Sequence, residues 1–299
     1  MSLENILEVS GNGISLTLFR GFVIISKEGA EIGRKAFNEF SCLLIASNGV
    51  NLTTNLLNRL IEEKIPVLIC NEKFEVSGIL SPTAPHSFFR ERLEWQLNAS
   101  IAFKKQVWQK VVKEKILNQA SVLRQFQKND ENLQMLAKNI LSGDSGGAEA
   151  QAAKIYFKQL FGQDFIRNTE FAGQNAMLNY GYAVLRSCVV RSIFASGLLP
   201  ALGIFHKNKE NPFCLADDFI EAFRPAVDFL VKSLPKTEEL TPEIKKELVK
   251  VLMLEVECEE GVYTTANGIL KAVQSYVKAL ETQNSKAISF PKLLFSTLG

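Results

Sequence analysis

Histidine is scarce in this sequence, which contains only two, His86 and His206. The five cysteines are scattered and form no C-x-x-C pair, so the sequence predicts neither a disulfide framework nor a zinc knuckle. A basic segment followed by an apolar one is missing from the N-terminus, so we expect no signal peptide. The most apolar run, residues 193–205, is short and interrupted by glycine and proline, so we expect no membrane span. Together these absences predict a cytoplasmic protein with reduced thiols.

An excess of charge of either sign is also missing, because 34 lysines and arginines nearly balance 32 aspartates and glutamates. With a net charge of +2, any binding of nucleic acid must depend on a local basic patch. Residues 1–80 contain no glycine-rich loop that would hold a phosphate. The remaining composition, 46% apolar and 22% charged over 299 residues, is that of a globular protein with room for two domains.

Two regions of different character follow one another along the chain. Residues 1–80 consist of short apolar or alternating runs separated by glycine-containing turns, which predicts a β-rich domain with one amphipathic helix over residues 53–63. Residues 81–87 include two prolines and predict a linker. Residues 88–299 take on a helical character. The sequence therefore predicts an α+β protein with its strands in the first third.

The first helical stretch, residues 90–128, is basic: it holds nine lysines and arginines against three acids, with aromatic residues between them. One interpretation is a pair of helices that contacts the phosphates of a nucleic acid. The other is an ordinary amphipathic helix with a solvated basic face and an aromatic core stripe. The candidates for DNA binding in this stretch are Lys104, Lys105, Lys110 and Lys113.

One stretch brings a histidine close to acids, since His206 is followed by Asp217, Asp218 and Glu221. In a helix, residues three and four apart share a face, and an imidazole that converges with carboxylates makes a site for a divalent cation. Without a metal, the clustered acids should repel one another. The competing interpretation is a capping box, with Asp218 as N-cap and Glu221 at N3. Pro225 would then lie inside the new helix, at a cost of about 3 kcal/mol.

Two further features concern charged groups in apolar surroundings. Glu149 falls in the first turn of an alanine-rich helix that begins after a Gly-Gly pair, where the helix dipole alone favours a carboxylate. Arg186 and Arg191 lie in a mostly apolar helix over residues 183–196. Arginines in such a helix require anionic partners.

Three runs, taken in order, resemble a known family: residues 175–182 (NAMLNYGY), 195–206 (ASGLLPALGIFH) and 215–225 (LADDFIEAFRP). With the β-rich first third and the proline linker, they are similar to the CRISPR-associated integrases, or endonucleases, of the spacer-acquisition complex, the Cas-one family. The similarity is greatest to the type II branch, which accompanies an RNA-guided effector nuclease. In this family a glutamate, a histidine and a second acid hold a metal ion. The resemblance places these ligands at Glu149, His206 and Glu221, with Asp218 at a further acidic position of the catalytic site.

The resemblance also implies an architecture and partners. Residues 1–80 would form a β-rich dimerisation domain, and residues 88–299 an all-α catalytic, metal-binding domain. Two homodimers would clamp a dimer of the small companion protein, of the Cas-two family, in a four-to-two assembly on double-stranded DNA. The effector nuclease is a further candidate partner, and no membrane is involved. Arg186 and Arg224 join the candidates for DNA binding.

The implied reaction is integration by transesterification, in which a prespacer 3′-OH attacks a phosphodiester of the repeat and expels a 3′-oxygen. Mg²⁺ or Mn²⁺ would polarise the phosphoryl group. Carboxylates suit Mg²⁺, and the imidazole shifts the preference toward Mn²⁺. No protein nucleophile is needed, in keeping with the absence of a Ser-His-Asp or Cys-His arrangement. The alternatives are a metal-dependent endonuclease acting on branched or double-stranded DNA, with water as nucleophile, and a non-catalytic DNA-binding scaffold.

Overall fold

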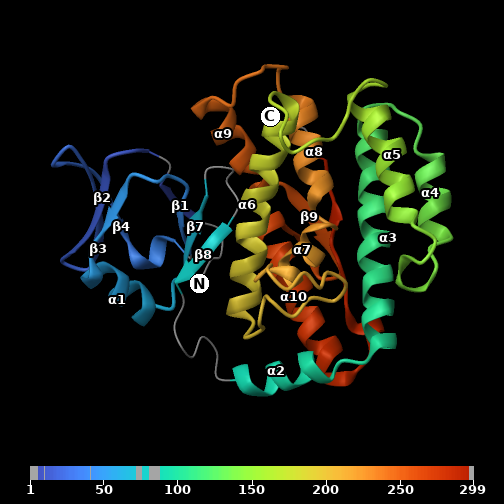
Figure 1. The fold of residues 1–299 in the computed structure, drawn as a ribbon, viewed down its shortest axis with the longest axis horizontal. Coiled ribbons are helices and arrows are strands. Elements are labelled where there is room, and N and C mark those ends of the chain that lie inside the picture. The colour runs from blue at the N-terminus through green and yellow to red at the C-terminus, as the bar shows by residue number, and fades with distance from the viewer. Residues whose placement is uncertain (1–5, 10, 41, 72–75, 81–87, 296–299) are drawn as a thin grey trace. The chain divides into compact units, whose positions relative to one another are not determined.

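The computed structural model describes residues 6–9, 11–40, 42–71, 76–80 and 88–295 (Figure 1). The chain divides into two compact units, residues 1–87 and residues 88–299, which we describe separately. The predicted linker, residues 81–87, lies outside the described residues, and so does His86. No helix in the described part of the chain is both long and apolar enough to cross a membrane.

The first unit contains two four-stranded sheets and one helix, α1 (Thr54–Glu62). One sheet has the order β1-β5-β7-β8, with β8 antiparallel to β7 and the other pairs parallel. The other has the order β4-β3-β2-β6, antiparallel except for the β2–β6 pair. The strands are β1 (Ile6–Val9), β2 (Ile14–Phe19), β3 (Phe22–Lys27), β4 (Ala30–Ala36), β5 (Cys42–Ile45), β6 (Val50–Leu52), β7 (Val67–Cys70) and β8 (Val76–Leu80).

Local sequence explains these elements well. Strands β2 and β3 are joined by two residues, Arg20 and Gly21, that both have positive φ, as the tight turns of β-hairpins require. Thr53 caps α1 by accepting a hydrogen bond from the backbone N–H of Leu56. The core of this unit includes Leu16 on β2 and Leu56 on α1, both fully buried. The predicted β-rich first third is confirmed.

The second unit is mainly helical. Its helices are α2 (Phe89–Asn98), α3 (Ile101–Gln125), α4 (Glu131–Lys138), α5 (Ala148–Phe161), α6 (Gln174–Ala195), α7 (Cys214–Ile220), α8 (Arg224–Ser233), α9 (Pro242–Val249) and α10 (Thr265–Thr282). The prediction of an α+β protein is confirmed, but the second unit is not purely helical. It also contains a three-stranded antiparallel sheet of β9 (Glu255–Cys258), β10 (Gly261–Thr264) and β11 (Lys292–Leu293). These strands have two to four residues, too few for a clear alternating pattern.

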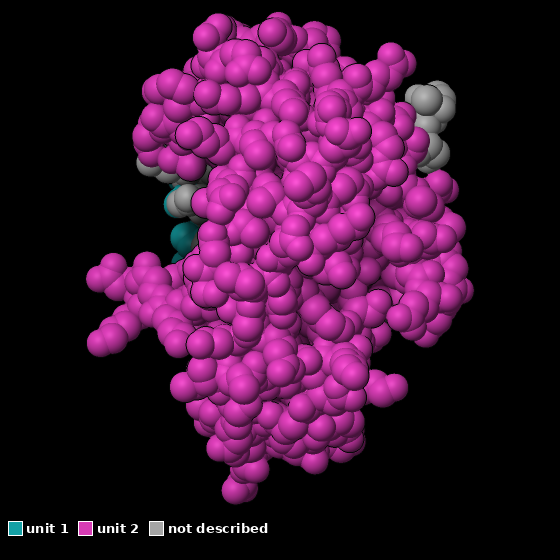
Figure 2. Space-filling model, turned by 90° about the vertical axis from the view of Figure 1, so that its right-hand side faces the viewer, with its two compact units in different colours: residues 1–87 teal, residues 88–299 magenta. Residues whose placement is uncertain are grey.

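Helices α7 and α8 lie between the long helices α3 and α6 and contact both (Figure 1). Helix α5 packs against α3 on the other side. Figure 2 shows the face of this unit that α3, α4 and α5 form at the right of Figure 1. The core is tight, with Trp108 of α3, Phe219 of α7 and Tyr276 of α10 each at most 1% exposed. The first turn of α5 and the end of α7 are thereby brought to the same helix, α3.

Candidate metal centre

Two of the predicted metal ligands meet at one point. The ammonium Nζ of Lys115, on α3, lies 2.6 Å from Oε1 of Glu149 and 2.5 Å from Oε2 of Glu221. The guanidinium of Arg224 lies 2.9 Å from the other oxygen of Glu221. The side chains of Lys115 and Glu221 are only 10% and 8% exposed, and that of Glu149 is 28% exposed. The result is a largely buried cluster of two carboxylates and two cations.

Glu149 is positioned by the start of α5, which begins as the sequence predicts. The carboxylate of Asp144 accepts hydrogen bonds from the backbone N–H groups of Ala148, at 2.7 Å, and Glu149, at 3.2 Å. Gly147 precedes the helix with φ of 65°, a conformation that suits glycine. Asp144 therefore satisfies two N–H groups at the helix start that have no partner inside the helix.

His206 is held by Asp218, which is completely buried in α7. The carboxylate of Asp218 accepts hydrogen bonds from the backbone N–H groups of Ile204, Phe205 and His206, and it contacts Nδ1 of the His206 ring at 2.7 Å. This hydrogen bond raises the pKa of His206. With Nδ1 turned to a carboxylate, Nε2 is the nitrogen left for a ligand, the arrangement usual for metal-binding histidines. The His206 side chain is 42% exposed, so a ligand can reach it.

The loop before His206 depends on a close approach that only glycine permits. A Cβ atom on Gly203 would lie 2.4 Å from the carbonyl oxygen of His206 and 3.0 Å from Oδ2 of Asp218. Any larger residue would therefore push the loop away from α7. Gly203 lies within one of the runs that carry the family resemblance, but no local pattern in that run indicates this close approach.

The capping-box interpretation of Asp218 and Glu221 is wrong. Asp218 lies inside α7, and its carboxylate binds a neighbouring loop; Glu221 follows the last residue of α7 and pairs with cations. Pro225 occupies the first turn of a new helix, α8, where a missing N–H costs no intrahelical hydrogen bond. The cost expected for a proline in a helix interior therefore does not arise.

The expectation that the clustered acids repel one another is also wrong, because each acid has its own partner. Asp217 forms a two-pronged ion pair with Arg186, at 2.7 and 3.1 Å, which is the anionic partner predicted for that arginine. Burial opposes the charge of Glu221, but Arg224 and Lys115 outweigh it and hold the pKa of Glu221 below its usual value. Burial likewise opposes the charge of Lys115, but Glu221 and Glu149 raise its pKa. Lys115 and Glu221 therefore favour each other's charged forms.

Within the described residues, no three His, Cys, Asp or Glu side chains lie close enough together to hold a metal ion. Glu149 and Glu221 are instead joined through the ammonium of Lys115, which donates a hydrogen bond to each. His206 is near enough to help lower the pKa of Glu221. In chemical type, two carboxylates and an imidazole oriented by a carboxylate are donors that suit Mg²⁺ or Mn²⁺.

The predicted DNA-binding residues have different surroundings. Lys105 and Lys113 are exposed on α3, and Lys104 is half-buried, with burial and repulsion from Lys207 lowering its pKa. Lys110 instead donates hydrogen bonds to the backbone oxygens of Lys286 and Ile288. The two arginines, Arg186 and Arg224, are engaged in the ion pairs described above.

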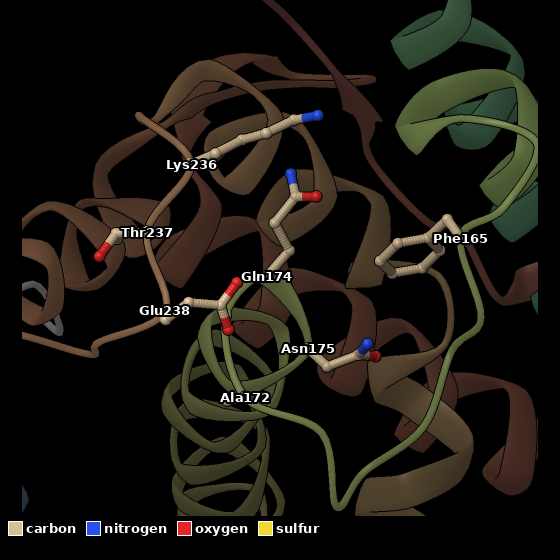
Figure 3. A pocket seen from close by; sticks show the side chains of 8 residues that line it. Phe165, Ala172, Gln174, Asn175, Lys236, Thr237 and Glu238 are labelled. Atoms are coloured by element: carbon tan, nitrogen blue, oxygen red, sulfur yellow. The ribbon is translucent and has the colours of Figure 1, made fainter.

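An aromatic contact lies beside His206, and a pocket lies elsewhere in this unit. The ring of Phe205, 50% exposed, stacks on buried Trp108 at a centroid distance of 4.4 Å, and His206 meets Trp108 edge-on at 5.8 Å. A pocket of about 500 Å³ lies at the start of α6, lined by side chains that include Phe165, Lys236 and Glu238 (Figure 3). None of the predicted site residues lines this pocket.

Comparison with known proteins gives a consistent result. The sequence profile of the family described as "CRISPR associated protein Cas1" matches residues 7–264. The CRISPR-associated endonuclease Cas1 of Neisseria meningitidis serogroup C (strain 8013) is 40% identical over 290 residues, 95% of this chain and 94% of the relative. CRISPR-associated endonuclease Cas1 1 of Francisella tularensis subsp. novicida is 26% identical over 276 residues, 84% of this chain and 85% of the relative.

Solved structures share the fold. A casposase bound to integration product matches with a TM-score of 0.76 at 20% identity, covering 93% of this chain and 91% of that one. A Cas1 protein from Thermotoga maritima matches with a TM-score of 0.74 at 17% identity, covering 93% and 97%. A chain of a Cas6-RT-Cas1–Cas2 complex matches with a TM-score of 0.78 at 20% identity, covering 99% of this chain and 37% of that one.

Proposed function

This chain belongs to the Cas1 family of CRISPR-associated proteins, and we propose that it is a metal-dependent DNA integrase of CRISPR adaptation. The observation that carries the proposal is the convergence of Glu149 and Glu221 on one cationic point, with His206 held nearby by Asp218. Its relatives are named endonucleases, and a casposase bound to integration product has the same fold. Both agree with chemistry at a DNA phosphodiester.

Each residue of the proposed metal centre has its own role. Glu149 and Glu221 would supply carboxylate oxygens and His206 its Nε2 as metal ligands. When bound, Mg²⁺ or Mn²⁺ would polarise the phosphodiester and favour ionisation of the attacking 3′-OH. Asp218 acts through His206, because it fixes the ring and the backbone of its loop. Arg224 helps to keep Glu221 ionised, as a metal ligand must be.

The partners belong to the same proposal. Residues 1–80 would join two copies into a homodimer, and two dimers would flank a dimer of the small Cas-two companion on double-stranded DNA. A solved Cas6-RT-Cas1–Cas2 complex contains a chain of this fold, which supports a companion of that kind. Placement in the type II branch, with the effector nuclease as a further partner, depends on the sequence runs at 175–182, 195–206 and 215–225.

Hydrolysis is the second candidate function, because the relatives are named endonucleases and the same three ligands could activate water. The scaffold alternative no longer has the support of the capping interpretation, since Asp218 and Glu221 are not helix caps. Integration assays with and without the companion protein separate strand transfer from hydrolysis.

Removing one ligand at a time tests the proposal. Glu149→Gln, Glu221→Gln and His206→Ala should each reduce strand transfer by orders of magnitude and abolish the rise in melting temperature that Mn²⁺ produces in the parent protein. Glu281→Gln, which removes an exposed carboxylate from α10, is the matched control and should keep both properties. Strand transfer at the parent rate in Glu221→Gln would refute the assignment.

A further inference from the structure

Lys115 is the one member of the buried cluster that the proposed reaction does not use. Its ammonium lies 2.6 Å from a Glu149 oxygen and 2.5 Å from a Glu221 oxygen. Hydrogen bonds of this length between a cation and carboxylates are short and strong. A lysine that only anchored α3 to a neighbour would need one such partner, but Lys115 joins an acid of α5 to an acid that follows α7.

The charges of the cluster already balance. Lys115 and Arg224 together neutralise Glu149 and Glu221, and of these two acids Arg224 pairs only with Glu221. A divalent ion added to this arrangement would leave two unbalanced positive charges in a largely buried site, which is costly. If the ammonium leaves, the same two oxygens become available and the local charge turns negative.

We propose that the ammonium of Lys115 is a resident cation, which occupies the position of the divalent ion in the metal-free protein and must leave before the ion binds. This inference depends on the proposed metal site. Lys115 thereby keeps Glu149 and Glu221 assembled without metal. Only molecules in which Lys115 has moved away can bind the ion, so the apparent metal affinity is the intrinsic affinity multiplied by the fraction of such molecules.

The displacement can be tested in the parent protein by lysine labelling. Mass spectrometry after treatment with an amine-acylating reagent should show low labelling of Lys115 without metal and several-fold more with saturating Mg²⁺. Lys154, exposed on the same helix as Glu149, is the internal control, and its labelling should not change.

Substitution tests the competition. Lys115→Met should bind Mn²⁺ about tenfold more tightly than the parent in calorimetric titration, because no resident cation has to be displaced. Lys154→Met removes the same charge from the surface and should bind as the parent does. Without metal, Lys115→Met should melt at a lower temperature, and Mn²⁺ should raise that temperature more than in the parent. If Lys115→Met does not fold without metal, Mn²⁺ should restore folding, and Lys115→Gln should behave alike.

A merely structural lysine gives the opposite pattern. If Lys115→Met binds Mn²⁺ with equal or lower affinity, if Mn²⁺ does not rescue its folding, or if Mg²⁺ leaves the labelling of Lys115 unchanged in protein shown to bind it, the inference is overturned. Failure of the proposed function looks different: the parent would then show no Mn²⁺ binding that Glu221→Gln removes.

Discussion

Asp228 should make this protein less stable as the pH rises from about 4 to about 6. It lies on α8, is 1% exposed, and accepts a hydrogen bond from the hydroxyl of Tyr182 at 2.5 Å. Burial disfavours the charged carboxylate and raises the pKa of Asp228 from 3.8 to about 6, even though Tyr182 and Arg224 favour the charge. Asp228 therefore behaves in the opposite way to the ion-paired Glu221.

The sign and size follow from proton linkage. Because the folded pKa is the higher one, the folded state keeps a proton that the unfolded state releases between pH 3.8 and about 6. The resulting contribution to stability is fully present below pH 3.8 and is lost as the pH rises through about 6. A separation of about two pH units corresponds to on the order of 3 kcal/mol at 25 °C.

Asp228→Asn removes the charge at every pH and keeps an oxygen that can accept from Tyr182. The quantity to measure is the free energy of urea unfolding of the mutant minus that of the parent, at several pH values from 4 to 7. This difference should increase toward pH 7 by on the order of 3 kcal/mol. Any constant cost of the new amide group cancels in the comparison between pH values.

Asp164→Asn, which replaces an exposed aspartate, is the matched control and should show a small, even difference across the series. If the Asp228→Asn difference stays flat, or if the mutant loses stability relative to the parent toward pH 7, burial does not control this carboxyl group and the reasoning fails.

Three other substitutions follow from the contacts of the site. Gly203→Ala places a Cβ 2.4 Å from the His206 carbonyl oxygen and so displaces the loop that carries His206. Strand transfer should fall at least about tenfold, while the circular dichroism spectrum stays near that of the parent. An unchanged rate would contradict this interpretation of the packing. The double mutant Lys104→Ala, Lys105→Ala should make the slope of log K for DNA binding against log[salt] shallower by about 0.9 per lost phosphate contact, as measured by fluorescence anisotropy. An unaltered slope would show that these lysines are only solvated surface. Lys110→Ala should instead lower the free energy of unfolding by about 1 kcal/mol, because its ammonium binds backbone oxygens of Lys286 and Ile288; unchanged stability in urea unfolding would count against that role.

The sequence predicts the elements that local patterns control. The start of α5 after Gly147, helix α1 and the division between a β-rich and a helical part all follow from capping and periodicity. The short strands β9 to β11 are not predicted from the sequence, because they are too short for an alternating pattern. Asp218 and Glu221 show the limit of local reasoning. Their spacing suits a capping box, but their side chains bind partners that are distant in the sequence.

Those distant partners are what a single sequence does not contain. Lys115 is 34 residues before Glu149 and 106 before Glu221, and in the sequence it is one of nine cations in a basic stretch. Its neighbour Lys113 has a similar sequence context but is exposed. Only the packing of α3 against α5, α7 and α8 distinguishes a buried counter-ion from a solvated lysine.

The buried cations also connect the candidate metal centre to Asp228. The guanidinium of Arg224 lies 2.9 Å from Glu221 and 4.7 Å from the centre of the Tyr182 ring, whose hydroxyl binds Asp228. Its positive charge is therefore shared between a predicted metal ligand and an acid that burial drives toward neutrality. When Asp228 is protonated, Arg224 loses one of its anionic neighbours, and Glu221 remains its ion-pair partner. Arg224 thus interacts electrostatically with both Glu221 and Asp228, although Asp228 itself is no candidate ligand.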